Sequence, residues 1–245
     1  MNFNYQMRYS KTGRARFISH LDTLRCLVRA LRRTGVELAF SQGMRPKPIL
    51  SLAMPLGVGI EGEDEICDFS LKSRAPLTEL AKDITRELPQ GIELRSVGPT
   101  FDRAKAAARV DSCSYRMELS GSASAYEDAV RQYNAESELV LMRRRPKGDK
   151  EVDIKKYVEQ IDLLEGDRGI TFDMKVTPEG TARPDEIISA LSGFAGQELK
   201  PERIVRTRIR LIEEEQPKAP RPGGKPRLGG KPRPGGRPRP NGRRR

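Results

Sequence analysis

The strongest constraint on the fold is an order of hydrophobic patterns that occurs twice along the chain. Alternation of apolar and polar residues is typical of a half-buried strand, whereas apolar residues spaced by three and four indicate a helix. In the first half, residues 3–9 alternate, and leucines then recur at helical spacing between the capping residue Ser19 and Gly35. The other elements expected in this half are strands over 48–54 and 65–71, a helix over 76–88 and a strand over 92–97.

The second half repeats this order of strands and helices. Its strand patterns cover 113–119, 139–143, 170–176 and 205–211, and its helical patterns follow Ser124 and begin at Pro184. Residues 153–164 are compatible with a strand or a short helix. The order β-α-β-β-α-β is that of a ferredoxin-like unit. We therefore expect an α+β chain of two tandem ferredoxin-like units, 1–104 and 105–213.

Residues 214–245 predict a disordered basic tail. Hexapeptides such as APRPGG, KPRPGG and RPRPNG combine cations with proline and glycine, and from Gln216 onward the chain holds 11 of its 46 lysines and arginines and no acid. Such a segment buries too little apolar surface to offset the entropy cost of ordering. Residues 1–215 hold 35 basic and 34 acidic side chains, so almost all of the net charge of +12 belongs to the tail.

The composition narrows the class of protein further. There is no run of about 18 apolar residues and no apolar secretory segment near the first residue, so we expect no membrane span and a cytoplasmic location. The cysteines Cys26, Cys67 and Cys113 show no CxxC or CxxxCxxC spacing, which argues against a zinc or iron–sulfur site on this chain. We expect buried, reduced thiols and no bound metal.

Arginines gather on one side of the first expected helix, next to the side that carries its leucines. Further cations stand just before and just after this helix. The complete set is Arg14, Arg16, Arg25, Arg29, Arg32, Arg45 and Lys47. Because a guanidinium group donates two parallel hydrogen bonds to a phosphate, this pattern favours contacts with an RNA backbone. The alternative is a solvated helix face with intramolecular ion pairs.

The loop that follows this helix, SQGMRPKP at 41–48, combines glycine, prolines and cations. Gly43 permits a positive φ or a close approach of another backbone, and the prolines stiffen the segment. We expect Ser41, Gln42 and Gly43 to shape an RNA-binding loop in which Arg45 and Lys47 contact phosphates. The alternative is an ordinary connection between a helix and a strand.

His20 is the one histidine of the chain. A histidine can act as a general acid or base near neutral pH. Its position in the first turn of the expected helix, toward the leucine side, favours instead a histidine that packs or supports the cap. With no second histidine, nucleophilic and metal catalysis are weakly indicated.

The segments FISHLD at 17–22 and SQGxxPxP at 41–48 resemble the uncharacterised radical-SAM-linked family, over about residues 5–211. Members are encoded beside, or fused to, a B12-binding-type radical SAM protein. Met44, Arg45 and Lys47 stand where the family usually has an aromatic residue, asparagine and histidine. Lysine cannot replace histidine as a proton shuttle near neutral pH, so these departures favour binding over acid–base chemistry.

The resemblance implies an accessory role, with the iron–sulfur cluster, S-adenosylmethionine and, for the B12-binding type, cobalamin on the partner and no cofactor on this chain. We expect a non-catalytic protein that binds RNA, either transfer or ribosomal, and presents it to a radical SAM enzyme for modification. One alternative is a metal-independent ribonuclease with His20 as general acid or base, since the duplicated fold also resembles the CRISPR repeat-cleaving nucleases. Another is a structural protein associated with RNA or the ribosome that acts through its tail.

Overall fold

The structure is a computed structural model of the 245-residue chain, and it describes residues 2–102, 104–119, 123–146, 148–164 and 169–212. The contacts between residues divide the chain into two compact units, Met1–Glu213 and Glu214–Arg245. The second unit holds the expected disordered tail and lies outside the described residues.

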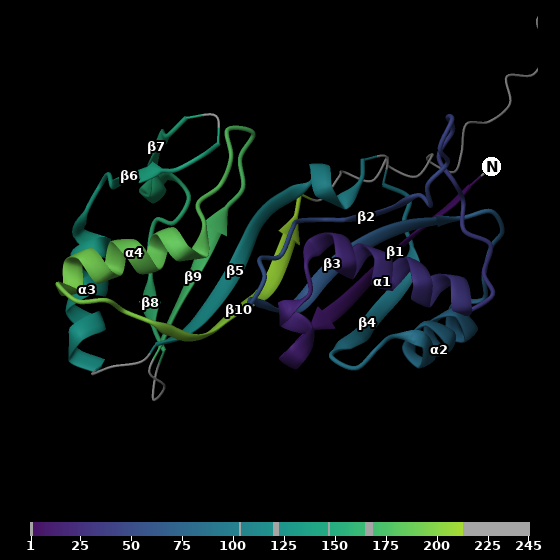
Figure 1. The fold of residues 1–245 in the computed structure, drawn as a ribbon, viewed down its shortest axis with the longest axis horizontal. Helices are drawn as coiled ribbons and strands as arrows, with labels where there is room; N and C mark the ends of the chain where they lie inside the picture. The colour runs from purple at the N-terminus through teal and green to yellow at the C-terminus, as the bar shows by residue number, and fades with distance from the viewer. Residues whose placement is uncertain (1, 103, 120–122, 147, 165–168, 213–245) are drawn as a thin grey trace, which may run out of the picture. The chain divides into compact units, whose positions relative to one another are not determined.

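The described residues form the mixed α+β fold that the sequence predicts (Figure 1). The helices are α1 (His20–Arg33), α2 (Leu77–Glu87), α3 (Ala123–Ala135) and α4 (Pro184–Ala195). The strands are β1 (Phe3–Lys11), β2 (Leu50–Leu52), β3 (Glu61–Leu71), β4 (Ile92–Pro99), β5 (Val110–Leu119), β6 (Val140–Arg143), β7 (Lys150–Asp153), β8 (Asp162–Leu163), β9 (Gly169–Lys175) and β10 (Pro201–Leu211). Short 3-10 helices are η1 (Gly13–Phe17), η2 (Ala106–Ala108) and η3 (Ile154–Lys156).

One sheet runs through both halves of residues 1–213. Its strand order is β4-β1-β3-β10-β5-β9-β8, with β2 added to β3, and β6 pairs separately with β7. Neighbouring strands are antiparallel except for β3 and β10, which run parallel with Val205 opposite Glu61 and Arg206 opposite Gly62. This parallel pairing brings the last described strand of the chain against a strand of the first half.

The strand order within each half is compatible with the expected ferredoxin-like units. It is β4-β1-β3-β2 in the first half and β10-β5-β9-β8 in the second. However, the two halves share one sheet, and the second half contains the additional β6–β7 pair. The tandem arrangement and the expected boundary at residue 104 therefore remain an interpretation of the sequence.

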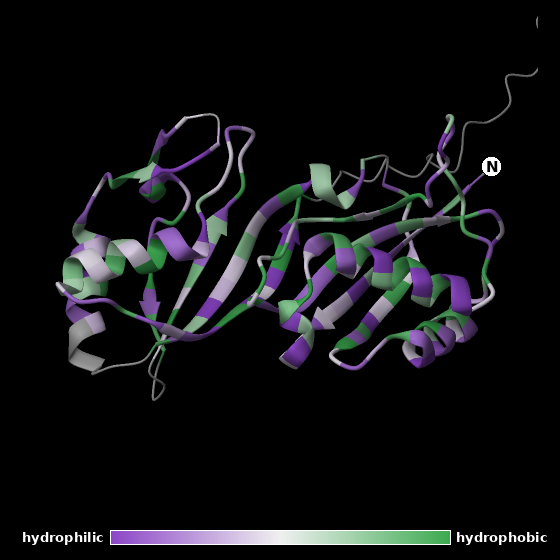
Figure 2. Ribbon diagram, viewed as in Figure 1, coloured by the Kyte–Doolittle hydropathy of each residue, from purple (hydrophilic) through white to green (hydrophobic). Residues whose placement is uncertain are grey.

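In the first half, a buried core lies between the sheet and the helices α1 and α2. Tyr5 and Met7 of β1 pack in this core with Leu27 of α1. Because successive side chains of a strand point to opposite faces, Gln6 and Arg8 lie on the face of the sheet away from these helices. The alternation of hydrophobic and hydrophilic residues along the strands is visible in Figure 2.

In the second half, α3 and α4 pack on the sheet through a second core. Cys113, Tyr115 and Met117 of β5 are buried there with Tyr133 of α3 and Leu191 of α4. Full burial of a large apolar side chain contributes about 1.5–3 kcal/mol to stability. The alternating residues of β5 therefore stabilise the packing of this strand against α3 and α4.

Several element boundaries differ from those expected, and β2, β5 and β10 span 50–52, 110–119 and 201–211 rather than 48–54, 113–119 and 205–211. β3 begins at Glu61 rather than at residue 65, because the polar stretch 61–64 pairs with β1 and β10. The ambiguous stretch 153–164 contains both η3 and the short strand β8. Ser124, expected to precede a helix, lies inside α3.

Candidate functional site

The helix α1 separates an apolar face from a cationic one. Ser19 caps its first turn, where the side-chain oxygen accepts a hydrogen bond from the backbone N–H of Asp22. Leu27 and Leu31 are buried against the sheet. Arg25, Arg29 and Arg32 are exposed, and their spacing of four and three residues places them on one face, which we call the arginine face.

The arginine face is only partly neutralised by acids. Arg25 forms an ion pair with Asp22, 2.9 Å from Nη1 to Oδ1. Arg33, at the edge of this face, contacts Glu87 at the end of α2, 2.8 Å from Nε to Oε2. Within the described part of the chain, Arg29 and Arg32 form no ion pair. Two exposed guanidinium groups therefore keep their hydrogen-bond donors available.

A groove of about 400 Å³ runs beside the arginine face, between α1 and the turn after α2. Its lining residues are Asp22, Arg25, Cys26, Arg29, Arg33 and Pro89. Three arginines against one aspartate make the groove cationic. A negatively charged, extended ligand is the kind that such a groove favours.

The loop 41–48 lies next to the C-terminal end of α1. The guanidinium of Arg32 stands over the ring of Phe40, 5.9 Å from its centroid, and Phe40 forms a β-bridge with Pro48 at the base of the loop. The backbone N–H of Ser41 bonds the carbonyl of Lys47 at 2.8 Å, and the N–H of Lys47 bonds Ser41 Oγ at 3.1 Å. Ser41 thus closes the loop.

The tip of this loop is open to solvent. Gly43 has φ 130°, in the range that favours glycine, and Gln42 is exposed. Arg45 and Lys47 are also exposed, and among the described residues neither forms an ion pair. The base of the loop, at Phe40, therefore lies at one end of the arginine face, and the loop carries two further exposed cations.

The remaining expected cations lie beyond the other end of α1. Arg14 and Arg16 belong to η1, and α1 has 14 residues, so about 20 Å of helix separates them from the loop. Arg14 is exposed, whereas Arg16 contacts Glu61, 3.2 Å from Nη1 to Oε1. The expected residues thus follow α1 as a stripe and do not converge on one point.

Glu61 holds Arg16 in place. It is 3% exposed and also accepts hydrogen bonds from Arg203 at 2.7 Å and from the backbone N–H of Gly13 at 3.2 Å. Burial of Glu61 opposes its negative charge, but the bonds from Arg203, Arg16 and Gly13 outweigh it and lower the pKa of the Glu61 carboxyl. Arg16 therefore has an intramolecular partner, whereas Arg14 forms no ion pair with any of the described residues.

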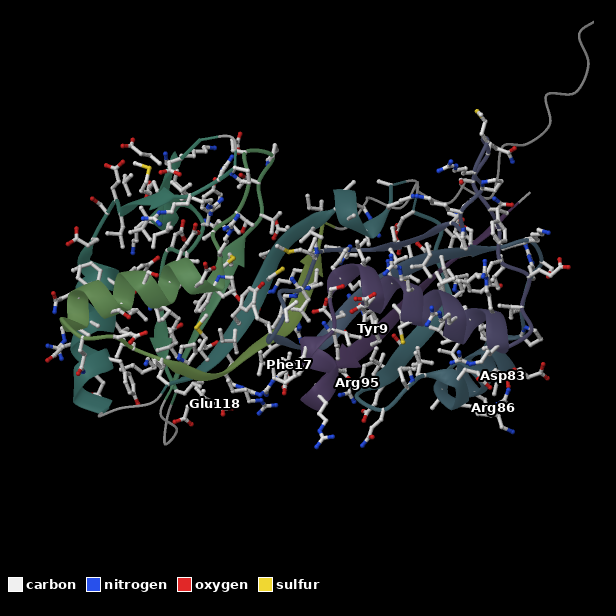
Figure 3. The ribbon with its side chains drawn as sticks, viewed as in Figure 1. Tyr9, Phe17, Asp83, Arg86, Arg95 and Glu118 are labelled. Carbon is white, nitrogen blue, oxygen red and sulfur yellow. The ribbon has the colours of Figure 1, made fainter. Side chains whose placement is uncertain are left out.

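Phe17, labelled in Figure 3, is the first residue of the FISHLD segment and an exposed aromatic residue that the sequence analysis did not include among the expected RNA-binding residues. It is 60% exposed, and the guanidinium of Arg16 stands 4.8 Å from its ring centroid. An exposed ring next to arginines suits the stacking of an unpaired base. The signal in the sequence was an aromatic residue inside the run GRARF, just before the helix cap.

His20 is the first residue of α1 and is half-buried. Its Nδ1 is buried without a hydrogen-bond partner among the described residues. The cap is formed by Ser19, whose hydroxyl also donates to Asp22 Oδ2 at 2.7 Å. Among the described residues, no three His, Cys, Asp or Glu side chains gather in a way that could hold a metal ion.

The sequence reasoning missed a buried ion pair that joins β3 to β10. Arg206 of β10 contacts Glu65 of β3 at 2.6 and 2.8 Å, and it also donates to the carbonyls of Met54 and Pro55. Burial disfavours the charge of Arg206, but Glu65 more than offsets this and raises the pKa of the guanidinium. The sequence signal that could have indicated this pair is a glutamate at an inward-facing position of a strand.

Lys11 extends this ionic cluster toward the helix cap. It is 1% exposed, and its Nζ donates to the carbonyl of Ile18 at 2.8 Å. Burial lowers the pKa of Lys11, while the nearby Glu65 opposes that shift. Lys11 therefore connects this buried ionic cluster to the backbone just before α1.

The fold and site define a mixed α+β protein with a cationic helix face. The chain belongs to the family described as "Uncharacterized protein conserved in bacteria (DUF2344)", which it matches over residues 4–184. A comparison with curated proteins finds no match. In the described residues, none of the helices is both long and apolar enough to cross a membrane.

The solved structures that are similar to this chain include the following two. One is a chain of a Cbf5-Nop10-Gar1 complex, with 12% identity, a TM-score of 0.46, and coverage of 84% of this chain and 48% of that chain. The other is an unknown protein from Galdieria sulphuraria, with 12% identity, a TM-score of 0.26, and coverage of 82% of this chain and 99% of that chain. This chain thus spans about half of the first structure's chain.

Proposed function

We propose that this protein is a non-catalytic accessory protein that binds RNA along α1 and presents it to a radical SAM enzyme. The observation that carries the proposal is the set of exposed cations without ion pairs on η1, on α1 and on the loop 41–48. Within the described residues this set includes Arg14, Arg29, Arg32, Arg45 and Lys47. An acid one turn away stabilises an arginine on a solvated helix face, and among the described residues of the arginine face only Arg25 has such a partner.

The extent of the stripe favours a polymer over a small anion. Because α1 is about 20 Å long, cations at its two ends contact phosphates several nucleotides apart. Phe17 at one end offers a ring on which an unpaired base can stack. The basic tail adds a non-specific attraction for RNA, so we assign specificity to α1 and the loop 41–48.

The radical SAM partner is proposed from the resemblance of the FISHLD and SQGxxPxP segments. The iron–sulfur cluster, S-adenosylmethionine and cobalamin then belong to that partner. The positions of the cysteines support assigning the iron–sulfur cluster to the partner, because Cys67 and Cys113 are buried in different strands and Cys26 lies on α1. A cytoplasmic location is part of the same proposal.

The test measures the salt dependence of binding to bulk transfer RNA by the full chain. Each phosphate contact contributes about 0.7–0.9 to the slope of log affinity against log salt. We expect the double variant Arg29→Ala/Arg32→Ala to lower this slope by about 1.4–1.8. The matched control is Arg144→Ala/Arg145→Ala, which removes two exposed arginines from the β6–β7 connection and keeps the tail.

The two variants carry the same net charge, so a difference between their slopes reports the position of the two arginines that were removed. If the α1 variant changes the slope no more than the control, the arginine face is not the RNA interface. Capture of the chain from its native cell tests the partner separately, since absence of a radical SAM protein from the captured material contradicts that part.

The ribonuclease alternative requires its own experiment because His20 has a buried Nδ1 without a partner. Transfer RNA is incubated with the full chain in EDTA. Cleavage that is present in the wild type and lost in His20→Ala favours the enzyme. Binding without cleavage in both chains favours the accessory role.

A further inference from the structure

A second cationic feature lies on the face of the sheet away from α1 and α2. There, a cavity of about 630 Å³ is bounded by β1, β3, β10 and the connection between β4 and β5. Arg8 faces it from β1, on the side opposite the buried Met7 and Tyr9. Arg208 and Arg210 enter it from β10, flanking Ile209, which is buried in the other core. A cavity of this size is within the range of small-ligand sites.

Arginines outnumber acids in the lining of this cavity. The charged lining residues are Arg8, Asp64, Asp102, Arg109, Arg208 and Arg210. Arg8 pairs with Asp64 and Arg109 pairs with Asp102. Arg210 pairs with Asp173, 3.2 Å from Nη1 to Oδ2, but both side chains are about half exposed. In the described part of the chain, Arg208 forms no ion pair and is exposed.

Arg109 supplies an independent sign of a ligand. It is 8% exposed, and its Nε is buried without any hydrogen-bond partner among the described residues. More than nine in ten buried polar groups in proteins are paired, and an unpaired donor on a buried cation is costly. Arg109 lines the cavity, and Asp102 contacts its Nη2, so the Nε–H remains without an acceptor among the described residues.

We propose that this cavity is a phosphate-binding site, in which Arg109 and Arg208 hold the phosphate group of a nucleotide or of an RNA chain. The oxygens of a phosphate match the parallel donors of a guanidinium group, and the excess of arginines favours a doubly charged anion. Arg8 and Arg210 add positive potential from the neighbouring strands. The site is separate from the arginine face because the sheet lies between Arg8 and α1.

The test titrates the ¹⁵N-labelled full chain with inorganic phosphate at constant ionic strength and follows the arginine Nε–Hε signals by NMR. The Arg109 signal is assigned from its loss in Arg109→Lys. We expect this signal to shift and saturate in the wild type. A lost charge-assisted hydrogen bond corresponds to at least about a tenfold loss of affinity, which we expect for Arg208→Ala.

Arg144→Ala is the matched control, because it removes one exposed arginine outside the cavity. Its phosphate affinity is expected to stay within about twofold of the wild type, the scatter of a surface substitution. The proposal is overturned if the Arg109 signal does not saturate, or if Arg208→Ala and Arg144→Ala lose affinity equally. Since Arg208 is exposed, its variant remains informative even if Arg109→Lys does not fold.

Two further ligands identify the source of the phosphate. Saturation by adenosine 5′-monophosphate but not by a short RNA without terminal phosphates supports a nucleotide site, and saturation by both supports an RNA backbone site. Arg29→Ala/Arg32→Ala is expected to keep the Arg109 response. Failure of the α1 interface and failure of this cavity are therefore distinguishable.

Discussion

Glu65→Gln is expected to destabilise the protein strongly, because the substitution leaves buried cations without their anion. Glu65 is 2% exposed and accepts hydrogen bonds from Arg206 at 2.6 and 2.8 Å. Lys11, 1% exposed, is the second buried cation whose pKa depends on Glu65. Glutamine keeps the shape of the side chain, so the loss reports charge and not a cavity.

The magnitude follows from the burial of both partners. Removing one member of a buried ion pair typically costs about 3–5 kcal/mol, because the remaining charge stays desolvated. The total free energy of unfolding of a domain is about 5–15 kcal/mol, so this is a large fraction of it. For about 150–250 residues, each kcal/mol shifts Tm by about 2–4 °C, which predicts a decrease of about 6–20 °C.

Thermal and urea unfolding followed by circular dichroism measure this effect. The matched control is Glu118→Gln, since Glu118 (Figure 3) makes the same kind of contact with Arg203, 3.2 Å from Nη1 to Oε1, but its side chain is 40% exposed. An exposed pair contributes about 0–1 kcal/mol, so the control is expected to shift Tm by only a few degrees. A Glu65→Gln decrease no larger than that of Glu118→Gln would refute the reasoning.

Two further predictions follow from the pKa shifts. Burial of Glu61 favours a higher pKa, but the bonds from Arg203, Arg16 and Gly13 outweigh burial and lower the pKa from 4.5. The bonds to the ionised Glu61 therefore stabilise the protein above about pH 4.5, and this stabilisation is lost as the pH falls through the lowered pKa. Glu61→Gln should therefore lower the free energy of unfolding at pH 7 and flatten its decline below about pH 4.5, and an unchanged acid decline in urea titrations contradicts this. Burial raises the pKa of all three thiols, that of Cys113 to about 11 and that of Cys67 well above its usual value, but Cys26 is only half-buried. Mass spectrometry after alkylation at pH 8 should find Cys26 modified first and the other two only in urea, and equal rates for all three contradict the buried placement.

Local pattern was sufficient to predict the elements that face the candidate site. Ser19 and the leucine spacing predicted α1, and the structure places Ser19 as its cap and Leu27 and Leu31 in the core. The alternation over 3–9 predicted β1. These predictions succeed because capping and burial act between residues a few positions apart, where the sequence is read directly.

Local sequence patterns could not predict which distant strands pair. Glu65 and Arg206 are 141 positions apart, and the residues next to each of them in the sequence do not indicate its partner. The early start of β3 has the same origin, since residues 61 and 62 pair with β10. The cavity around Arg109 likewise combines segments that are far apart in the sequence, from β1, β3, β10 and the connection between β4 and β5.

The sequence by itself determined the alternation of strands and helices, the cationic side of α1 and the concentration of net charge in the last thirty residues. Only the tertiary structure decided which arginines keep their donors available. Arg16 and Arg33 are held by Glu61 and Glu87, from strands and helices distant in the sequence, while Arg29 and Arg32 meet no carboxylate among the described residues. The physical reason is that an ion pair depends on distance in space, which chain folding sets and residue spacing does not.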